Sequence, residues 1–370
     1  MKKIFNVLAL SLLLVTITGC TKKYTILGEM PIAGFDGATV YLVDMNDGNT
    51  KDSTVIADGI FSFNDRIKEP RLATLVTSNG VEQYRSVVVL EKGTIHINLV
   101  NDSLYGTPMN DLFFQSFTAD TVSERLNAQI HDILTRYQNA APGEEQVGLV
   151  TEYNMVQSLL DAHNLDVNRK VYEQNKDNIV GAYALSQMVE YEGMNFDKLD
   201  SIMNHSGKVI TDFEPLRKMR RMLFNIDNTS EGKKYVDIEG IDFASGEATK
   251  LSNMLNNDQV TLIDFWASWC GPCRREISEN LVRLYNKYNA KGLNIIGIDV
   301  WDKLPDHQKA VEDLGITYPQ LIDTTKTATD NYGVNSIPTI LLLDKEGIII
   351  KRNIRGNDIE PAIKEALGLK

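Results

Sequence analysis

The sequence predicts an α/β domain at the C-terminal end of a 370-residue chain, preceded by a small antiparallel β domain and a helical region. Short alternating strands come first, helical periodicity follows, and buried strands then alternate with helices. The predicted parts are residues 1–19 (signal peptide), 20–105 (β-sandwich-like domain), 106–224 (helical region), 225–234 (linker) and 235–370 (α/β domain).

The β domain is predicted by strands whose side chains alternate between two faces. Near residue 95, Ile95 and Ile97 fall on one face, and His96 and Asn98 fall on the other. Asp-Gly and Asn-Asp-Gly turns separate such strands, as is typical of small antiparallel sandwiches or barrels. We expect His96 to be a solvated strand residue rather than a ligand.

The helical region is predicted by apolar residues that recur every three or four positions. One such stripe covers residues 122–137 and is ended by Ala141-Pro142-Gly143. Further helices are expected over residues 150–164, 171–191, 196–204 and 214–224. None of them carries a catalytic pattern, so a spacer or docking platform is expected. Residues 225–234 are polar and contain glycine, which predicts the linker.

The α/β domain is predicted by apolar strands separated by helical segments. Strands are expected over residues 260–267, 293–300, 339–343 and 347–351, and helices over 277–288, 305–314 and from about Ile359. Alternation of this kind places helices on both faces of a central sheet.

The charge of the chain limits its partners. The formal net charge is −12 at pH 7, whereas binding to nucleic acid requires a basic face. The one dense basic run, residues 217–221, is expected to be the solvated side of a helix. We therefore expect no nucleic-acid partner.

The N-terminus has the pattern of an export signal. Lys2 and Lys3 precede an apolar run that ends at Gly19-Cys20. Residues 17–20 resemble a bacterial lipoprotein box, in which the cysteine is acylated; an ordinary signal peptide with an incidental cysteine is the alternative. Two or three acyl chains on Cys20 would anchor the protein stably to a membrane, facing the periplasm.

Cys270 and Cys273 are the only other cysteines, and they lie where a strand gives way to a helix. At a helix N-terminus, unpaired N–H groups and the helix dipole favour thiolate over thiol at Cys270. Cys273 follows on the same helix face, within reach of a disulfide. Pro272 suits the first helical turn because it lacks an N–H.

Three roles are open to this pair: metal binding, a structural disulfide or redox exchange. A structural zinc site needs four ligands, and the five histidines have no paired spacing. A disulfide that closes so small a loop constrains the unfolded chain little. Redox exchange is therefore favoured, with no metal and no cofactor.

Asp264 supports redox exchange because it interrupts the apolar strand before the cysteines. A buried carboxylate costs free energy unless it is partnered, and burial raises its pKa. Beneath the cysteine pair, it could accept and return the proton of Cys273. The alternative is an aspartate on an edge strand that faces water.

The segment DFWASWCGPC, residues 264–273, resembles the active-site segment of the thioredoxin superfamily. The resemblance extends over residues 237–367 and includes Ile337-Pro338-Thr339 and Gly356. It implies a thioredoxin-like fold and a cis proline at Pro338 that faces the cysteines. It also implies that the main chain at Ile337 pairs with an extended substrate. The substrate-binding residues it implies are Trp269, Gly271, Pro272, Ile337 and Pro338.

Residues 301–325 resemble the insertion of the TlpA/ResA branch, whose members are membrane-tethered, exported thiol-disulfide oxidoreductases. The order of signal, β region, helices and oxidoreductase domain resembles members from Bacteroidetes. One departure matters: the strand at 293–300 lacks the lysine that accompanies the buried aspartate in thioredoxin. The Thr-x-x-Cys motif of peroxiredoxins is also absent, because Ala267-Ser268-Trp269 precede Cys270.

The resemblance implies a protein-disulfide reductase that acts by mixed-disulfide exchange. Its expected partners are disulfide-containing proteins or peptides, an upstream thiol electron donor, and a membrane reached through lipid on Cys20. The alternative is a redox-sensing or partner-binding lipoprotein whose disulfide is regulatory and turns over little.

Overall fold

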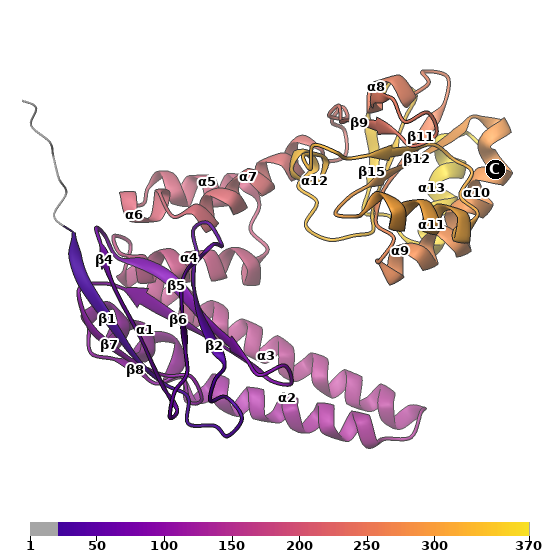
Figure 1. Cartoon of the computed structure of the whole chain (residues 1–370). Helices are drawn as coiled ribbons and strands as arrows, with labels where there is room; N and C mark the ends of the chain where they lie inside the picture. The colour runs from indigo at the N-terminus through magenta and orange to yellow at the C-terminus, as the bar shows by residue number, and fades with distance from the viewer. Residues whose placement is uncertain (1–20, 370) are drawn as a thin grey trace, which may run out of the picture. The chain divides into compact units, whose positions relative to one another are not determined.

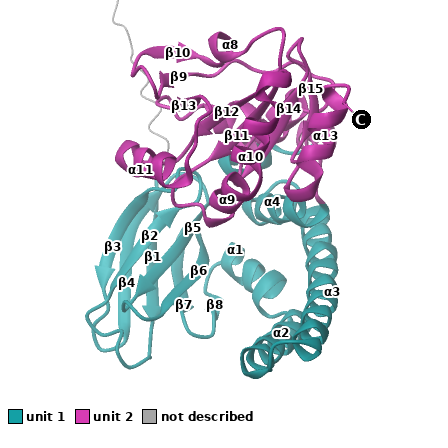
Figure 2. Ribbon diagram, turned by 90° about the vertical axis from the view of Figure 1, so that its right-hand side faces the viewer, with its two compact units in different colours: residues 1–192, 206–215 teal, residues 193–205, 216–370 magenta. Residues whose placement is uncertain are grey.

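The computed structural model describes residues 21–369 (Figure 1). These residues form two compact units (Figure 2): unit 1 contains the chain up to residue 192 and residues 206–215, and unit 2 contains 193–205 and the chain from 216. The predicted signal peptide and Cys20 lie outside the described residues. Within residues 21–369, no helix combines the length and the hydrophobicity needed to cross a membrane.

Unit 1 begins with two four-stranded sheets, which confirm the predicted β domain. Their strand orders are β4-β1-β7-β8 and β3-β2-β5-β6. Pairing is antiparallel except between β1 and β7, which run parallel. The strands are β1 (Lys22–Glu29), β2 (Thr39–Asp44), β3 (Thr50–Val55), β4 (Ile60–Ile67), β5 (Arg71–Ser78), β6 (Gln83–Leu90), β7 (Gly93–Asn98) and β8 (Leu104–Tyr105).

The predicted alternation in β7 is present. Ile95 and Ile97 are buried, whereas His96 is half-buried and stacks on Tyr105 with ring centroids 4.9 Å apart. The hydrophobic effect therefore fixes which face of this strand points inward, since a shift of one residue would expose both isoleucines.

The helices of unit 1 follow the strands. They are α1 (Pro108–Phe113), the π-helix η1 (Phe114–Thr118), α2 (Thr121–Asn139), α3 (Glu144–Gln174), α4 (Ile179–Glu192) and α6 (Lys208–Thr211). The helix α2 starts at Asp120, whose carboxylate accepts hydrogen bonds from the N–H groups of Val122 and Ser123. It packs on α3 as the two arms of a hairpin (Figure 1).

The single helix expected over residues 171–191 is interrupted. The helix α3 ends at Gln174 with Asn175 as its C-cap, and the side chain of Asn178 then accepts hydrogen bonds from Val180 and Gly181 N–H. Asparagine side chains compete in this way for backbone groups that would otherwise continue a helix. The apolar periodicity runs through this break, which is why the pattern did not reveal it.

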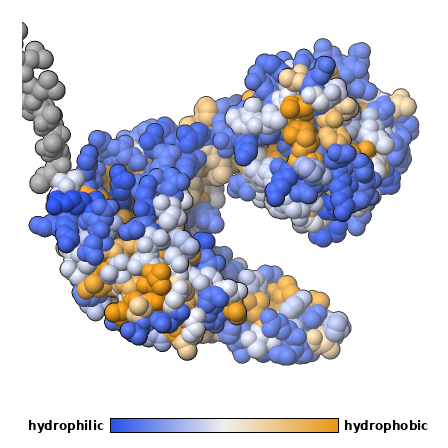
Figure 3. All heavy atoms as spheres, in the orientation of Figure 1, coloured by the Kyte–Doolittle hydropathy of each residue, from blue (hydrophilic) through white to orange (hydrophobic). Residues whose placement is uncertain are grey.

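Apolar side chains remain exposed near the tip of the hairpin of α2 and α3. Leu134 and Tyr137 on α2 and Val147 and Val150 on α3 are all more than a third exposed. Figure 3 shows orange atoms at this end of unit 1.

Unit 2 contains the predicted α/β domain. Its seven-stranded sheet has the order β10-β9-β13-β12-β11-β14-β15, in which β11, β12 and β13 are mutually parallel and the other pairs are antiparallel. The strands are β9 (Glu239–Asp242), β10 (Ala248–Lys250), β11 (Val260–Trp266), β12 (Leu293–Asp299), β13 (Gln320–Ile322), β14 (Thr339–Leu343) and β15 (Ile349–Arg352).

Helices cover both faces of this sheet. They are α8 (Leu251–Met254), α9 (Gly271–Glu276), the π-helix η2 (Ile277–Leu281), α10 (Val282–Tyr288), α11 (Leu304–Leu314), α12 (Ala328–Tyr332) and α13 (Ile359–Ala366), with short 3-10 turns η3 (Asn289–Lys291) and η4 (Gly356–Asp358). The predicted strands and helices agree with these bounds to within a few residues. The fold class predicted for residues 235–370 is confirmed.

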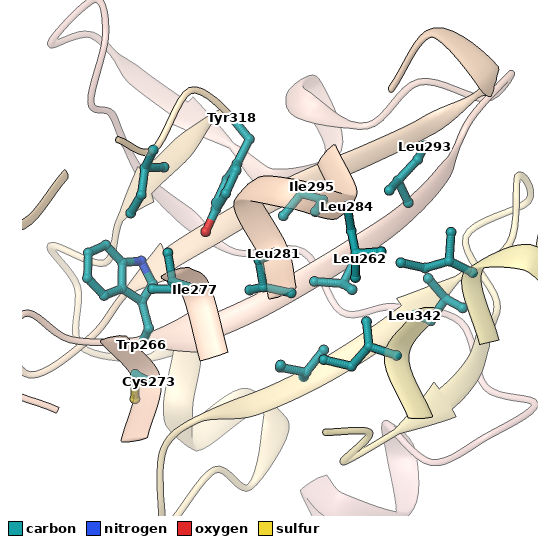
Figure 4. Close-up of a cluster of buried hydrophobic side chains, with 14 of the residues drawn as sticks. Leu262, Trp266, Cys273, Ile277, Leu281, Leu284, Leu293, Ile295, Tyr318 and Leu342 are labelled. Carbon is teal, nitrogen blue, oxygen red and sulfur yellow. The ribbon is translucent and has the colours of Figure 1, made fainter. Parts of the chain in front are cut away.

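Each face of the sheet has its own hydrophobic core. One cluster contains Leu262 and Trp266 from β11 with Ile277 and Leu281 from the helix that follows (Figure 4). The other contains Ile263 and Phe265 from the same strand with residues of α8 and α12. The strand thus supplies alternate residues to the two cores.

The helices α5 (Phe196–Asn204) and α7 (Glu214–Asn228) join the α/β domain instead of a separate helical region. Arg220 on α7 forms an ion pair with Asp200 on α5. A Cβ added to Gly333, the left-handed residue that ends α12, would lie 2.5 Å from Ile226 Cγ1 on α7. Glycine therefore permits the close approach of α7 to α12.

The segment expected to be a linker, residues 225–234, packs along the sheet. Its first four residues belong to α7, and the backbones of Gly232 and Lys233 exchange hydrogen bonds with Ile349 on β15. Thr229 is fully buried and accepts hydrogen bonds from Arg352 Nη1 at its carbonyl (3.0 Å) and its hydroxyl (2.9 Å). The polar composition of residues 225–234 predicted that they would be exposed to solvent. In the structure, their polar groups instead form hydrogen bonds with other parts of unit 2.

Arg352 also donates to the Tyr332 carbonyl at 2.6 Å, so we expect Arg352→Ala to leave three acceptors without their partner. Each buried unsatisfied group costs about 1–3 kcal/mol, and we expect unit 2 to lose about 2–4 kcal/mol. All three tryptophans lie in unit 2, so urea unfolding followed by tryptophan fluorescence measures this loss. Lys351→Ala is the control and should change stability by about 0.5 kcal/mol or less. Equal stability of the two variants would contradict the role of Arg352.

Candidate active site

The cysteine pair lies at the junction of β11 and α9. Cys270 is the N-cap of α9, and its carbonyl accepts the first helical hydrogen bond, from Arg274 N–H at 3.0 Å. The N–H of Cys273 points at Cys270 Sγ from 3.1 Å. A sulfur at this position receives a backbone donor and the positive end of the helix dipole. The site therefore stabilises negative charge on Cys270.

The two cysteines form a disulfide in the structure. Cys270 is 4% exposed and Cys273 is fully buried, so Cys270 is the sulfur nearer to solvent. Pro272 occupies the first turn of α9, as predicted, and both Gly271 and Pro272 are exposed. Within residues 21–369, no group of three potential metal ligands contains either cysteine.

The loop before β14 closes one side of the site. The Ile337–Pro338 peptide bond is cis, as the resemblance implies. Cys270 Sγ lies 3.8 Å from the carbonyl oxygen of Ile337. Pro338 is buried, Ile337 is half-buried, and the neighbouring Ser336 is exposed. The structure thus brings the two segments that carry the predicted site residues together, although 67 positions separate Cys270 from Ile337.

Asp264 lies within the sheet, which rules out the alternative of an edge strand. It pairs with Gly297 on β12 and Ile340 on β14 and is 1% exposed. Its position between Leu262 and Trp266 in the alternation places it on the face covered by α9, which carries the buried Cys273, and η2. Neither carboxylate oxygen has a hydrogen-bond partner among the described residues.

This environment raises the pKa of Asp264 from 3.8 to about 8. Desolvation by burial is the largest cause, and the carboxylate of Glu276 raises the pKa further. The guanidinium of Arg355 opposes both effects and lowers it. Asp264 is therefore mainly protonated at neutral pH in this state.

Glu276 and Arg355 were not predicted from the sequence. Glu276 is held in place by the N–H of Gly356 (3.0 Å) and the amide of Asn280 (2.7 Å), and Arg355 donates to the carbonyl of Pro338. Glu276 follows Cys273 by three residues on one helix face, which is a local signal that could have revealed it. Arg355 comes from a distant loop and had no such signal.

Two tryptophans form the rim beside Cys270. Trp269 is 61% exposed, and its Nε1 donates to the Trp301 carbonyl at 3.0 Å. Trp301 is 46% exposed and has a positive φ of 55°, which is unusual for a bulky residue. Trp269 was predicted as a binding residue, whereas Trp301 was not, because it belongs to the inserted segment.

Comparison with known families identifies two regions. Residues 232–352 match the AhpC/TSA family, and residues 24–113 match a domain of unknown function, DUF4369. The first match contains the cysteine pair, Asp264 and the cis proline. The second contains most of the strands of unit 1.

The curated relatives include thiol-disulfide oxidoreductases named ResA. The chain is 34% identical to ResA of Geobacillus thermodenitrificans over 105 residues, which are 28% of this chain and 59% of the relative. It is 25% identical to ResA of Bacillus subtilis over 125 residues, 34% of this chain and 68% of the relative. The chain spans 53–61% of the length of the first three relatives.

Among solved structures, the thioredoxin domain of a thiol-disulfide oxidoreductase from Bacteroides vulgatus is 28% identical, with a TM-score of 0.35, and the match covers 37% of this chain and 98% of that one. The family match falls on the domain that holds the cysteine pair. The C-terminal domain of this chain is therefore similar to the AhpC/TSA family and to the ResA thiol-disulfide oxidoreductases, and its fold is thioredoxin-like.

Proposed function

We propose that the chain is a protein-disulfide reductase that acts through Cys270 and Cys273. The observation that carries this proposal is the position of Cys270 Sγ, which receives the Cys273 N–H at a helix N-terminus and lies beside the Ile337 carbonyl. A thiolate at this position is stabilised and can be reached by a substrate. The similarity to ResA proteins supports the same reaction class.

The reaction consists of two exchange steps. The thiolate of Cys270 attacks one sulfur of a substrate disulfide, which breaks the substrate S–S bond and releases its second sulfur as a thiolate. The thiolate of Cys273 then attacks Cys270 Sγ, releases the first substrate sulfur and leaves the Cys270–Cys273 disulfide. Two electrons pass to the substrate, and an upstream thiol donor reduces the pair again.

Asp264 is the proton acceptor for Cys273 in the second step. Its carboxylate lies on the same side of the sheet as Cys273, and its raised pKa of about 8 brings it close to that of a thiol. Proton transfer between groups of similar pKa needs little driving force in either direction. Glu276 and Arg355 adjust this pKa in opposite directions.

Substrate binding is proposed at the rim of the site. Trp269, Gly271 and Pro272 are exposed beside Cys270, and they can contact the residues that flank a substrate cysteine. The backbone at Ile337 can pair with an extended substrate segment, as in strand addition. Pro338, which follows it, is buried behind this surface.

We further propose that acylation of Cys20 anchors the protein to a membrane facing the periplasm. The basic residues, the apolar run and the Gly19-Cys20 pair support this proposal. A compartment of this kind also allows disulfides to persist.

A second candidate is a redox-sensing or partner-binding lipoprotein with a regulatory disulfide. It is favoured by the large part of the chain that precedes the oxidoreductase domain, including the region of unknown function. Steady-state insulin reduction by the intact chain separates the two functions. Sustained turnover supports the reductase, and a single stoichiometric exchange supports the sensor.

Cys273→Ser should trap substrates as mixed disulfides on Cys270, because the attack that releases them is lost. The measurement is non-reducing electrophoresis after incubation with a disulfide-containing protein, with and without dithiothreitol. The double variant Cys270→Ser/Cys273→Ser is the control and should give no adduct. Equal patterns for the single and double variants would contradict the exchange mechanism.

Asp264→Asn should slow release of substrate from the mixed disulfide by about tenfold or more at pH 7. In the wild type, the rate of release should rise with pH until about pH 8, where Asp264 becomes ionised. The variant should lack this rise. Stopped-flow fluorescence of the three tryptophans between pH 5 and 9 follows the step. An identical pH profile for the two proteins would show that Asp264 is not the acceptor.

Asp264→Asn should slow the reaction but stabilise the folded protein. The reason is that Asp264 is protonated in the folded protein and ionised in the unfolded chain between about pH 4 and 8. The unfolded state then binds fewer protons, so stability declines as pH rises through this window. Asp264→Asn removes this loss. The variant should gain stability relative to the wild type between pH 4 and 8, as measured by thermal unfolding.

The reductase direction predicts a reducing potential for the cysteine pair. The Gly-Pro dipeptide between the cysteines is that of thioredoxin, for which the reduction potential is about −270 mV, against about −120 mV for a strong oxidant. Equilibration with glutathione buffers should give this pair a reduction potential closer to that of thioredoxin than to that of the strong oxidant. A potential above about −180 mV would overturn the assigned direction.

A further inference from the structure

Three potential metal ligands meet at the carboxyl end of β12, apart from the cysteines. Asp299 is the last residue of β12, Asp302 follows in the next turn, and His307 lies in the first half of α11. One ligand atom of each lies within 4.8 Å of those of the other two. Two atoms that each lie about 2.0–2.2 Å from one ion are at most about 4.4 Å apart, so a small adjustment of these side chains lets them share a cation.

His307 is fully buried, but its ring nitrogens are unsatisfied. Nδ1 lies 3.1 Å from Asp299 Oδ1, yet Nδ1, Nε2 and this oxygen all lack a hydrogen bond of acceptable geometry among the described residues. The rings of Phe243 and Trp266 flank the imidazole, with centroids 5.1 and 4.9 Å away. Buried polar atoms without partners cost about 1–3 kcal/mol each and are rare in folded proteins. This arrangement therefore points to a ligand that accepts lone pairs.

The charges at this position also favour a cation. Asp299 is 4% exposed and faces a second carboxylate, Asp302, and no lysine or arginine of the described chain forms an ion pair with either. Two carboxylates in a mostly dry site repel each other unless a positive charge lies between them. A divalent cation would supply that charge.

The carboxylate of Asp302 is held in one orientation by hydrogen bonds, as is common for carboxylates that bind metals. Its oxygens accept hydrogen bonds from the N–H and hydroxyl of Ser268 and from the N–H of Lys303, at 2.5, 2.8 and 2.8 Å. Such outer hydrogen bonds fix the direction of a ligating carboxylate and leave remaining lone pairs for the metal. They also connect the cluster to the segment that ends in Cys270.

We propose that His307, Asp299 and Asp302 bind a divalent transition-metal ion, with Zn²⁺ as the representative. One imidazole and two carboxylates form a mixed nitrogen and oxygen set that suits zinc, whereas Mg²⁺ and Ca²⁺ prefer oxygen alone. Three protein ligands leave a position for water. The bound ion would join the end of β12, α11 and Ser268, and so hold the rim beside Cys270.

The test uses the full chain with Cys270→Ser and Cys273→Ser, which removes both thiols of the redox pair as competing ligands. Isothermal titration with Zn²⁺ should show one saturable site, and Mg²⁺ should not compete. Adding His307→Gln should weaken Zn²⁺ binding by about tenfold or more. His131→Gln, an exposed histidine of unit 1, is the matched control and should leave binding unchanged.

A second variant and a second readout guard against misfolding. Asp302→Asn alters a partly exposed residue and should also weaken binding, and Zn²⁺ should raise the thermal unfolding temperature of the parent more than that of either variant. Co²⁺ bound in place of Zn²⁺ should give visible bands typical of nitrogen and oxygen ligands. The proposal is overturned if no saturable site exists, or if folded His307→Gln and Asp302→Asn proteins bind Zn²⁺ as the parent does.

Discussion

The pairing of β11 with a strand on each side constrains the rest of unit 2. All seven residues of this strand are buried because β12 and β14 occupy both edges and helices cover both faces. The strand has no freedom to shift, since a one-residue slip would exchange the residues of the two cores. The turn after Trp266 and the start of α9 are thereby fixed, and with them the position of Cys270.

The burial that fixes β11 also sets the chemistry of Asp264. A carboxyl group in this core is mainly neutral at pH 7 because burial disfavours its charged form. Arg355 donates to the carbonyl of Pro338, and Glu276 accepts a hydrogen bond from the N–H of the next residue, Gly356. The loop that faces the sulfur of Cys270 and the charges that act on Asp264 are therefore one connected structure. A molecule that displaced this loop would also change the electrostatic environment of Asp264, the proposed proton acceptor.

Sequence periodicity was sufficient to predict the strands and helices around the cysteines. Burial there repeats every two residues in the strands and every three to four residues in the helices. Periodicity was also sufficient for Asp264, since a lone acidic residue in an apolar strand is conspicuous. It did not reveal Arg355, whose effect on Asp264 depends on a loop 91 positions away in the sequence. The histidine spacing gave no indication of His307, whose neighbours Asp299 and Asp302 become close only when α11 folds back over β12. The contacts of residues 225–234 were not predicted for the same reason: their hydrogen-bond partners lie more than 100 residues further on.

The backbone of residues 232–234 has a consequence for the solubility of the protein. The strand β15 is the last strand at one end of the seven-stranded sheet, and an uncovered strand of this kind offers a row of free donors and acceptors to other chains. Here Gly232 and Lys233 occupy the groups of Ile349, and Lys234 forms a bridge with Ile348. The connection into the domain thus also shields its edge, so neighbouring copies of the chain lack this route to edge-to-edge aggregation.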